Sequence, residues 1–330
     1  TDPFSSTIAL ANKDETKSYA YYSISKVIDF VGAETAAELG SMSGLPKNVN
    51  YDVISMPGLY NSDLQRELIE NTELRGDALA IIDFDAGFKA AHENSGVESI
   101  PTTAGAVADA KSADYNSSYA ATYYPPVRLG GDDAGLIVPS SVAGVGVLAQ
   151  SDAASGAPWF APAGFNRGGI KRLGGNQGPR VSQAVENLSK ADRDDLYQQN
   201  INPIANFPGE GTVVFGQKTL QQTASALDRI NVRRLMIFLK KRISNVAETI
   251  LFDQNVPTTW NRFTAGANPI LDDAKSRFGI SEYKLILDET TTTASYQDQN
   301  IMYAKVIIKP AKAIEFIAID FTLTRSGIEF

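Results

Sequence analysis

Residues 138–166 constrain the fold of this chain more than any other segment. They begin with a run of small and aliphatic residues, VAGVGVLA, pass through a single acidic residue, Asp152, and a glycine, Gly156, and end in the block PWFAPAG. Such a run predicts a helix that packs very closely on a neighbouring element, since glycine lets two backbones approach. It is too short to span a membrane. A rigid Pro/Gly corner is expected to follow the helix.

The composition is typical of a soluble globular protein. The chain has 330 residues, of which 43% are hydrophobic and 21% are charged, and this length suffices for two domains with separate cores. Cysteine is absent and His92 is the only histidine. This inventory excludes disulfides, cysteine nucleophiles and histidine-clustered metal sites.

Charge is distributed unevenly along the chain. Residues 1–165 carry a net charge of −12 and residues 166–330 carry +4, which together give the net charge of −8. We therefore predict two domains, 1–165 and 166–330, with different neighbours. Compositional drift between domains is the plainer alternative.

The acidic part predicts an α/β domain built from βαβ units, because strand and helix patterns alternate. Short runs rich in β-branched, aromatic or apolar residues indicate strands at 51–56, 77–84 and 119–124. Apolar spacing indicates helices at 19–39, at 104–113, and between Ser62, the expected N-cap, and Gly76.

The basic part predicts an α+β domain. Helices are expected over 181–200, where Ser189 and Asp192 cap a second segment, over 228–255, the longest, and over 268–278. Strands are expected within 207–220 and 283–287. A final pair, 301–308 and 314–323, has apolar residues on both faces of its second strand. We expect residues 301–323 to supply strands to a sheet that neighbouring subunits complete.

Few residues point to catalysis. Asp83 and Asp85 follow a predicted strand, where α/β sheets often bind ligands, and Asp132 and Asp133 lie in a glycine-rich turn. An α/β hydrolase or nucleotide-binding enzyme that uses Asp83, Asp85 or Asp132 is the alternative hypothesis. No phosphate-binding loop and no dinucleotide fingerprint is present. We expect no catalytic site, no cofactor and no catalytic metal.

A cluster of basic residues lies on the predicted helix at 228–255. The bases fit a nucleic-acid surface poorly, because the sequence pI is near 4.9 and no aromatic residues interleave with them. A solvated face, ion pairs to a neighbouring subunit and, for some members, contacts within the chain are the other readings. The cluster comprises Arg229, Arg233, Arg234, Lys240, Lys241 and Arg242.

Five blocks, taken in order, resemble the sheath proteins of contractile phage tails and related injection machines. They are VAGVGVLAQSD with Gly156, Trp159 and PAG; LYQQNINPI; VVFGQKTL; INVRRL; and FDQNVPTTW. The resemblance covers roughly residues 119–288. Each block alone is modest, but five in the family's order are specific.

The resemblance implies a structural subunit rather than an enzyme. Its C-terminal domain would polymerise helically around a tail tube, and its acidic domain would lie outside. Implied partners are other copies, the tube, the baseplate and the tail terminator, with no direct nucleic acid and no stable membrane insertion. The implied location is the tail sheath of a virion made in the bacterial cytoplasm.

Sheath proteins carry more chain ahead of this region, so upstream chain is expected to be missing here. The basic cluster and the apolar end would form the subunit interface, the latter through Ile314, Phe316, Ile317, Ile319 and Phe321.

Overall fold

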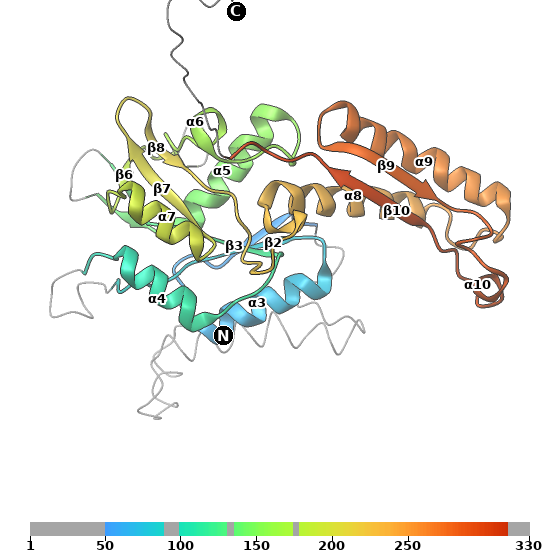
Figure 1. Cartoon of the computed structure of the whole chain (residues 1–330), viewed down its shortest axis with the longest axis horizontal. Coiled ribbons are helices and arrows are strands. Elements are labelled where there is room, and N and C mark those ends of the chain that lie inside the picture. Colours follow the sequence, from blue (N-terminus) through green and yellow to red (C-terminus); the bar gives the residue numbers. More distant parts are fainter. Residues whose placement is uncertain (1–49, 89–98, 131–134, 174–177, 316–330) are drawn as a thin grey trace, which may run out of the picture.

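The computed structural model describes residues 50–88, 99–130, 135–173 and 178–315. These residues form an α/β body from which a long arm of helices and strands projects to one side (Figure 1). Among the described helices, none combines the length and the apolar composition that a membrane span requires. The helix predicted at 19–39 and the turn with Asp132 and Asp133 lie outside the described residues.

The body is built on a five-stranded sheet in the order β1-β2-β3-β7-β8. The first four strands are parallel, and β8 runs antiparallel to β7. Every residue of β2 and β3 is buried, as expected for central strands covered on both faces. The strands are β1 (Val53–Ser55), β2 (Leu79–Ile82), β3 (Ala120–Tyr124), β7 (Ile201–Phe207) and β8 (Gly211–Val214).

Helices cover both faces of this sheet. On one face lie α3 (Ser62–Arg75), α4 (Thr103–Ala113) and α7 (Lys190–Gln198). On the other lie α5 (Ser140–Ser155) and the first half of α8 (Ile230–Glu248). The remaining elements of the body are the short α6 (Gly164–Arg167), the 3₁₀ helix η1 (Ala226–Asp228) and a small sheet of β5 (Ile137–Val138), β4 (Val127–Leu129) and β6 (Val181–Ala184).

The arm consists of the second half of α8 together with α9 (Pro257–Ser276), β9 (Ile280–Ile286), α10 (Ala294–Asp298) and β10 (Lys305–Pro310). Strands β9 and β10 form an antiparallel ribbon. Its inner face packs on both helices through Tyr283, Leu285, Val306 and Ile308. Because α8 contributes Ile237 to the core of the body and Leu239 to the core of the arm, one continuous helix joins the two parts.

The predicted βαβ units of the first part are confirmed, with strands and helices at the expected places. The expected N-cap of α3 is wrong by one residue, because Asn61 accepts the cap hydrogen bond from the Leu64 N–H. Gly76 ends α3 as predicted, with a φ of 66° that favours glycine.

Two expectations in the second part are wrong. Residues 181–184 form strand β6 rather than the start of a helix, although Ser189 and Asp192 do cap α7 as predicted. Helix α9 starts at Pro257 and runs through Pro269, so it is longer than α8 and longer than the helix expected at 268–278. Strand β10 pairs with β9. The predicted pairing of 301–308 with 314–323 stays a prediction, because residues 316–323 lie outside the described residues.

The predicted division after residue 165 stays a prediction. The main sheet takes β1, β2 and β3 from one side of that position and β7 and β8 from the other.

Candidate functional site: the joint between body and arm

Trp159, from the block PWFAPAG, lies at the root of the arm. Its ring is 4% exposed and meets the Phe238 ring edge-on at 5.3 Å between centroids. Its indole N–H donates to the carbonyl oxygen of Arg277 at 3.0 Å. Gly279 lies so close that a Cβ there would be 3.0 Å from the indole. The corner after α5 is therefore packed against the turn between α9 and β9.

Arg277, which follows α9 in the arm, contacts the corner that contains Trp159. Its guanidinium lies 5.2 Å from the Trp159 ring centroid. Its Nη2 donates to the carbonyl oxygens of Ser155 at 3.1 Å and Gly156 at 2.8 Å. These are the carbonyls at the C-terminal end of α5, where a positive charge also complements the helix dipole.

A second contact joins α5 to α8. Arg234 Nη1 donates to Asp152 Oδ1 at 2.9 Å, and Nη2 pairs with Oδ2 of the same carboxylate. The side chain of Arg234 is 5% exposed and that of Asp152 is 37% exposed. A bidentate pair fixes distance and orientation together, so it holds α8 in one position on α5.

The small residues of α5 bring this helix against the sheet, as predicted. A Cβ on Gly144 would lie 2.5 Å from the Tyr123 ring, closer than real contacts allow, so only glycine fits there. Ala143 and Val147 pack in the same core as Tyr123.

The structure places most of the predicted basic cluster in contacts within the chain. Arg233 is 7% exposed, donates to Ser118 Oγ and lies 3.8 Å from the Tyr119 ring centroid. Burial lowers its pKa. Arg233 and Arg234 thus point to different partners of their own chain, and neither is part of an exposed stripe.

The other bases of the cluster differ in exposure. Lys241 donates to Asp52 Oδ1 at 2.7 Å and to the Tyr51 carbonyl, whereas Lys240 donates to the Gly76 carbonyl at 3.1 Å and is exposed. Arg242 is exposed and lies 5.4 Å from the Phe238 ring centroid. Arg229 binds Glu315, which no sequence pattern singled out. A role of the cluster at a subunit interface stays a prediction.

The ribbon of the arm presents unpaired strand edges. Within the described part of the chain, β9 and β10 pair only with each other. The outer face of β10 exposes Lys305, Ile307 and Lys309, and Ile314 beyond it is 83% exposed. The unpaired edge of a strand such as β10 can pair with a strand of another chain unless it is covered. Of the apolar end predicted as interface, Phe316, Ile317, Ile319 and Phe321 lie outside the described residues.

Asp83 has a structural role that the sequence did not show. Its carboxylate accepts hydrogen bonds from Ser140 Oγ at 2.8 Å, from the Ser141 N–H at 2.7 Å, from Ser141 Oγ at 2.6 Å and from the Gly58 N–H at 3.2 Å. The residue is 2% exposed. It therefore binds the N-terminus of α5, where negative charge is favourable, rather than facing a substrate.

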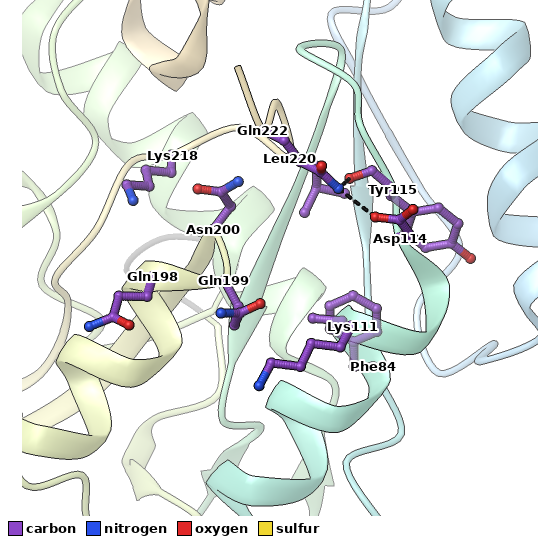
Figure 2. Close-up of a pocket in the computed structure, with 11 residues that line it drawn as sticks. Phe84, Lys111, Asp114, Tyr115, Gln198, Gln199, Asn200, Lys218, Leu220 and Gln222 are labelled. Atoms are coloured by element: carbon purple, nitrogen blue, oxygen red, sulfur yellow. Dashed lines mark hydrogen bonds between the residues drawn. The ribbon is translucent and has the colours of Figure 1, made fainter. Parts of the chain in front are cut away.

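A pocket with a volume of about 480 Å³ lies between the ends of α4 and α7. Figure 2 shows Gln198, Gln199 and Asn200 on one side of this pocket and Lys111 on the other, with Asp114 hydrogen-bonded to Gln222. Asp83 and Asp85 do not line this pocket. Among the described residues, no group of three or more His, Asp and Glu side chains is placed to hold a metal ion.

The geometry combines a body, an arm held to it by defined contacts and, within the described residues, a ribbon whose strands pair only with each other. Three comparisons indicate a structural subunit. Residues 222–324 match the phage tail sheath C-terminal domain. The tail sheath protein of Vibrio phage KVP40 is 40% identical over 204 residues, which cover 62% of this chain and 27% of that protein. The tail sheath protein of Enterobacteria phage T4 is 36% identical over 199 residues, which cover 60% and 29%.

Solved structures show the same fold. The sheath complex of the PVC extracellular contractile injection system, in its contracted state, superposes with a TM-score of 0.66 at 22% identity, covering 91% of this chain and 79% of that one. The baseplate structure of the anti-feeding prophage gives 0.65 at 21% identity, covering 88% and 73%.

Residues 222–324 thus match the phage tail sheath C-terminal domain, and the chain as a whole is similar to the tail sheath proteins of contractile phages. The matched domain and both relatives are those of structural tail sheath proteins, which argues against the hypothesis of an enzyme that uses Asp83, Asp85 or Asp132. The matched region spans less than a third of the length of these two curated relatives.

Proposed function

We propose that this chain is the C-terminal portion of a sheath subunit that polymerises helically around a tail tube. The observation that carries the proposal is the ribbon of β9 and β10, which offers open edges at the end of an arm fixed to the body. A contact in which an edge of one copy pairs with another patch of the next is heterologous, and such contacts generate helical filaments when they do not close.

Contraction would follow from two packings of the same subunits. The lattice is extended and metastable before a trigger at the baseplate, and shorter and wider afterwards. The difference in free energy between the two lattices, rather than hydrolysis, drives the tube through the host envelope. A stiff arm suits this task, because a displaced neighbour then moves the whole subunit. The Asp152–Arg234 pair and the Trp159 corner supply that stiffness.

The partners and location belong to the same proposal. The subunit binds other copies of itself, the tail tube, the baseplate and the tail terminator, and resides in the tail sheath of a virion made in the bacterial cytoplasm. Residues 166–330 form most of the inner, polymerising layer, and residues 1–165 lie outside. Of the basic cluster, the exposed Lys240 and Arg242 are the members proposed to face an acidic surface of a neighbouring copy.

The test uses the full-length subunit that contains this sequence. Wild-type protein is expected to form tubes in electron micrographs. Ile317→Pro removes a backbone N–H from the predicted exchanging strand and is expected to abolish tubes while the subunit stays folded. Ile317→Val retains the N–H and is the matched control. Discrete particles from wild-type protein would contradict the function, and normal tubes from the proline variant would contradict the role of that strand.

A further inference from the structure

The far end of the arm presents a group of exposed apolar side chains. Two loops meet there, residues 249–256 between α8 and α9, and residues 287–304, which contain α10 (Figure 1). The Asn255 side chain joins them by donating a hydrogen bond to the Ile301 carbonyl at 3.1 Å. We call this surface the arm tip. Apolar side chains that gather at one exposed place mark an interaction surface. The exposed large apolar and aromatic residues of the arm tip are Leu251, Phe252, Val256, Tyr296, Ile301 and Tyr303.

The arm tip is also acidic. The two loops, together with the last residue of α8, contain five acidic residues and no basic residue. All five acids are exposed, and they are Glu248, Asp253, Asp288, Glu289 and Asp298. The apolar group is therefore accompanied by negative charge, so a surface that complements it is both apolar and basic.

A surface of that kind lies on the body. Phe165, Phe207 and Phe215 form a cluster in which the three pairs of ring centroids are 5.0, 5.6 and 5.2 Å apart. Phe165 and Phe215 are 53% and 43% exposed. We call this cluster, with the pocket of about 350 Å³ that borders Phe215, the body patch. The charged residues that line the pocket include Lys190, Arg193 and Asp194.

The segment that runs along the body patch is basic. Residues 160–185 contain four basic residues and no acidic residue, namely Arg167, Lys171, Arg172 and Arg180. All of these except Arg167, which is partly buried, are exposed. The segment lies beside β8, since Gly169 forms a bridge with Val213. Positive charge thus accompanies the aromatic cluster, as negative charge accompanies the arm tip.

The arm tip and the body patch lie at opposite ends of one chain. Figure 1 shows α10 at the outer end of the arm, and α6 and β8 on the side of the body away from it. The Trp159 corner and the Asp152–Arg234 pair hold the arm in this position. The two surfaces therefore meet only between copies. A contact of this kind joins two different surfaces, so it is heterologous and extends into a filament when it does not close.

We propose that the arm tip of one copy of this chain docks on the body patch of a second copy, with Phe252 inserted beside Phe215. The proposal rests on the proposed function and adds to it a contact that needs no exchanged strand. Phe252 is the anchor because it is the most exposed of the six tip residues, so docking removes the most apolar surface from water there. The acids of the tip and the bases of residues 160–185 set the orientation of the two copies.

The first experiment tests the anchor in the full-length subunit that contains this sequence. Phe278→Ala is the matched control for Phe252→Ala. Phe278 is also an exposed phenylalanine with a positive φ, 61° against 70° for Phe252, but it lies in the turn between α9 and β9, at the root of the arm. The critical concentration for tube formation is measured by sedimentation and electron microscopy, and the melting temperature of unassembled subunits reports on the fold.

Phe252→Ala is expected to raise the critical concentration about tenfold, because it removes the anchor of the contact. Phe278→Ala is expected to match wild type. Neither change is expected to lower the melting temperature, since both side chains are exposed. Equal critical concentrations for the two variants would overturn the inference while the proposed function stands.

The second experiment identifies the partner by reversing charges. One variant carries Glu289→Lys and Asp298→Lys at the arm tip, another carries Lys171→Glu and Arg180→Glu beside the body patch, and a third carries all four changes. Each two-residue reversal is expected to raise the critical concentration at least about tenfold, because like charges then face each other. The four-residue variant is expected to return close to wild type, because its tip and patch are complementary again.

A four-residue variant that assembles no better than the two-residue variants would overturn the inference, since the arm tip would then meet a different partner, such as the tail tube. A loss of assembly in Phe252→Ala that tracks a lower melting temperature would also overturn it, because the residue would then serve the fold. Absence of tubes from wild-type protein would overturn both this inference and the proposed function.

Discussion

Arg234 on α8 and Asp152 on α5 form a bidentate ion pair that joins α5, which packs on the sheet, to the helix that continues into the arm. The arginine is nearly buried, at 5% exposure, whereas the carboxylate is partly open to solvent. Both residues belong to the blocks that carry the family resemblance, LAQSD and INVRRL. These two blocks, which are 82 positions apart at the paired residues, therefore meet at one joint.

Asp152→Ala is expected to lower the free energy of unfolding by about 3 kcal/mol, the low end of the range for a broken buried pair, because it leaves the Arg234 guanidinium without its partner. Denaturant unfolding measures this. Arg262→Ala breaks the exposed pair with Asp253, whose side chains are 59% and 38% exposed, and is expected to cost under about 1 kcal/mol. Equal effects of the two changes would refute the role of the joint.

Two glycines of α5 provide a matched test of the close approach to the sheet. Gly144→Ala places a methyl group 2.5 Å from the Tyr123 ring and is expected to destabilise the protein by about 1–2 kcal/mol through overpacking. Gly146→Ala meets only Leu173 Cδ2, at 3.7 Å, and is expected to stabilise the helix by about 0.5–1 kcal/mol. Thermal melts of both variants decide the point. A stabilising Gly144→Ala would show that α5 can move off the sheet without cost.

The first half of the fold could be predicted from sequence because its signals are local. Strand β2 is a continuous apolar run, Gly76 ends α3 in a left-handed conformation, and the small residues of α5 indicate a close contact. Secondary-structure predictions for the second half are wrong where tertiary contacts outweigh the local propensity of the residues. Strand β7 contains Asn202 and Pro203, which local propensity disfavours in strands.

The site shows the same division. Asp152 and Trp159 were visible as a motif, but the sequence cannot reveal that Arg234 and Arg277 are their respective partners. Arg277 contacts residues more than a hundred positions away, and Glu315 lies 86 positions from Arg229. Helix α9 was placed too late in the chain because Pro269, which suggests a helix start, lies inside it. Long-range pairs of this kind carry no periodic signal.

The structural role of the Asp83 carboxylate can be tested by measuring stability. Asp83→Ala removes three hydrogen bonds at the N-terminus of α5 and one from the Gly58 N–H, and is expected to destabilise the protein by about 3 kcal/mol. Asp63→Ala, at a more exposed acid in the first turn of α3, is expected to cost under about 1 kcal/mol. Chemical denaturation of both variants gives the comparison. Full stability of Asp83→Ala would indicate that the carboxylate is kept for another purpose.

The N-terminus of α7 is expected to respond to pH. Asp192 and Ser189 form a capping box in which the Asp192 carboxylate accepts from the Ser189 N–H at 2.8 Å and the Asp192 N–H donates to Ser189 Oγ at 3.2 Å. The hydrogen bonds with the side chain and then the backbone of Ser189 lower the pKa of Asp192 from its ordinary value of 3.8.

A carboxyl group whose pKa is lower in the folded state contributes stability above its unfolded value, and that contribution is lost as the pH falls through the folded value. Asp192→Asn is therefore expected to be slightly less stable than wild type at pH 7 and equally stable well below pH 3.8. Because Asp192 is only partly buried, the difference should be small, and hydrogen exchange of the first turn of α7 is the sensitive measure. Ser189→Ala removes the hydroxyl partner and is expected to cost about 1 kcal/mol at neutral pH. A difference between wild type and Asp192→Asn that persists unchanged at low pH would exclude the charge of Asp192 as its source.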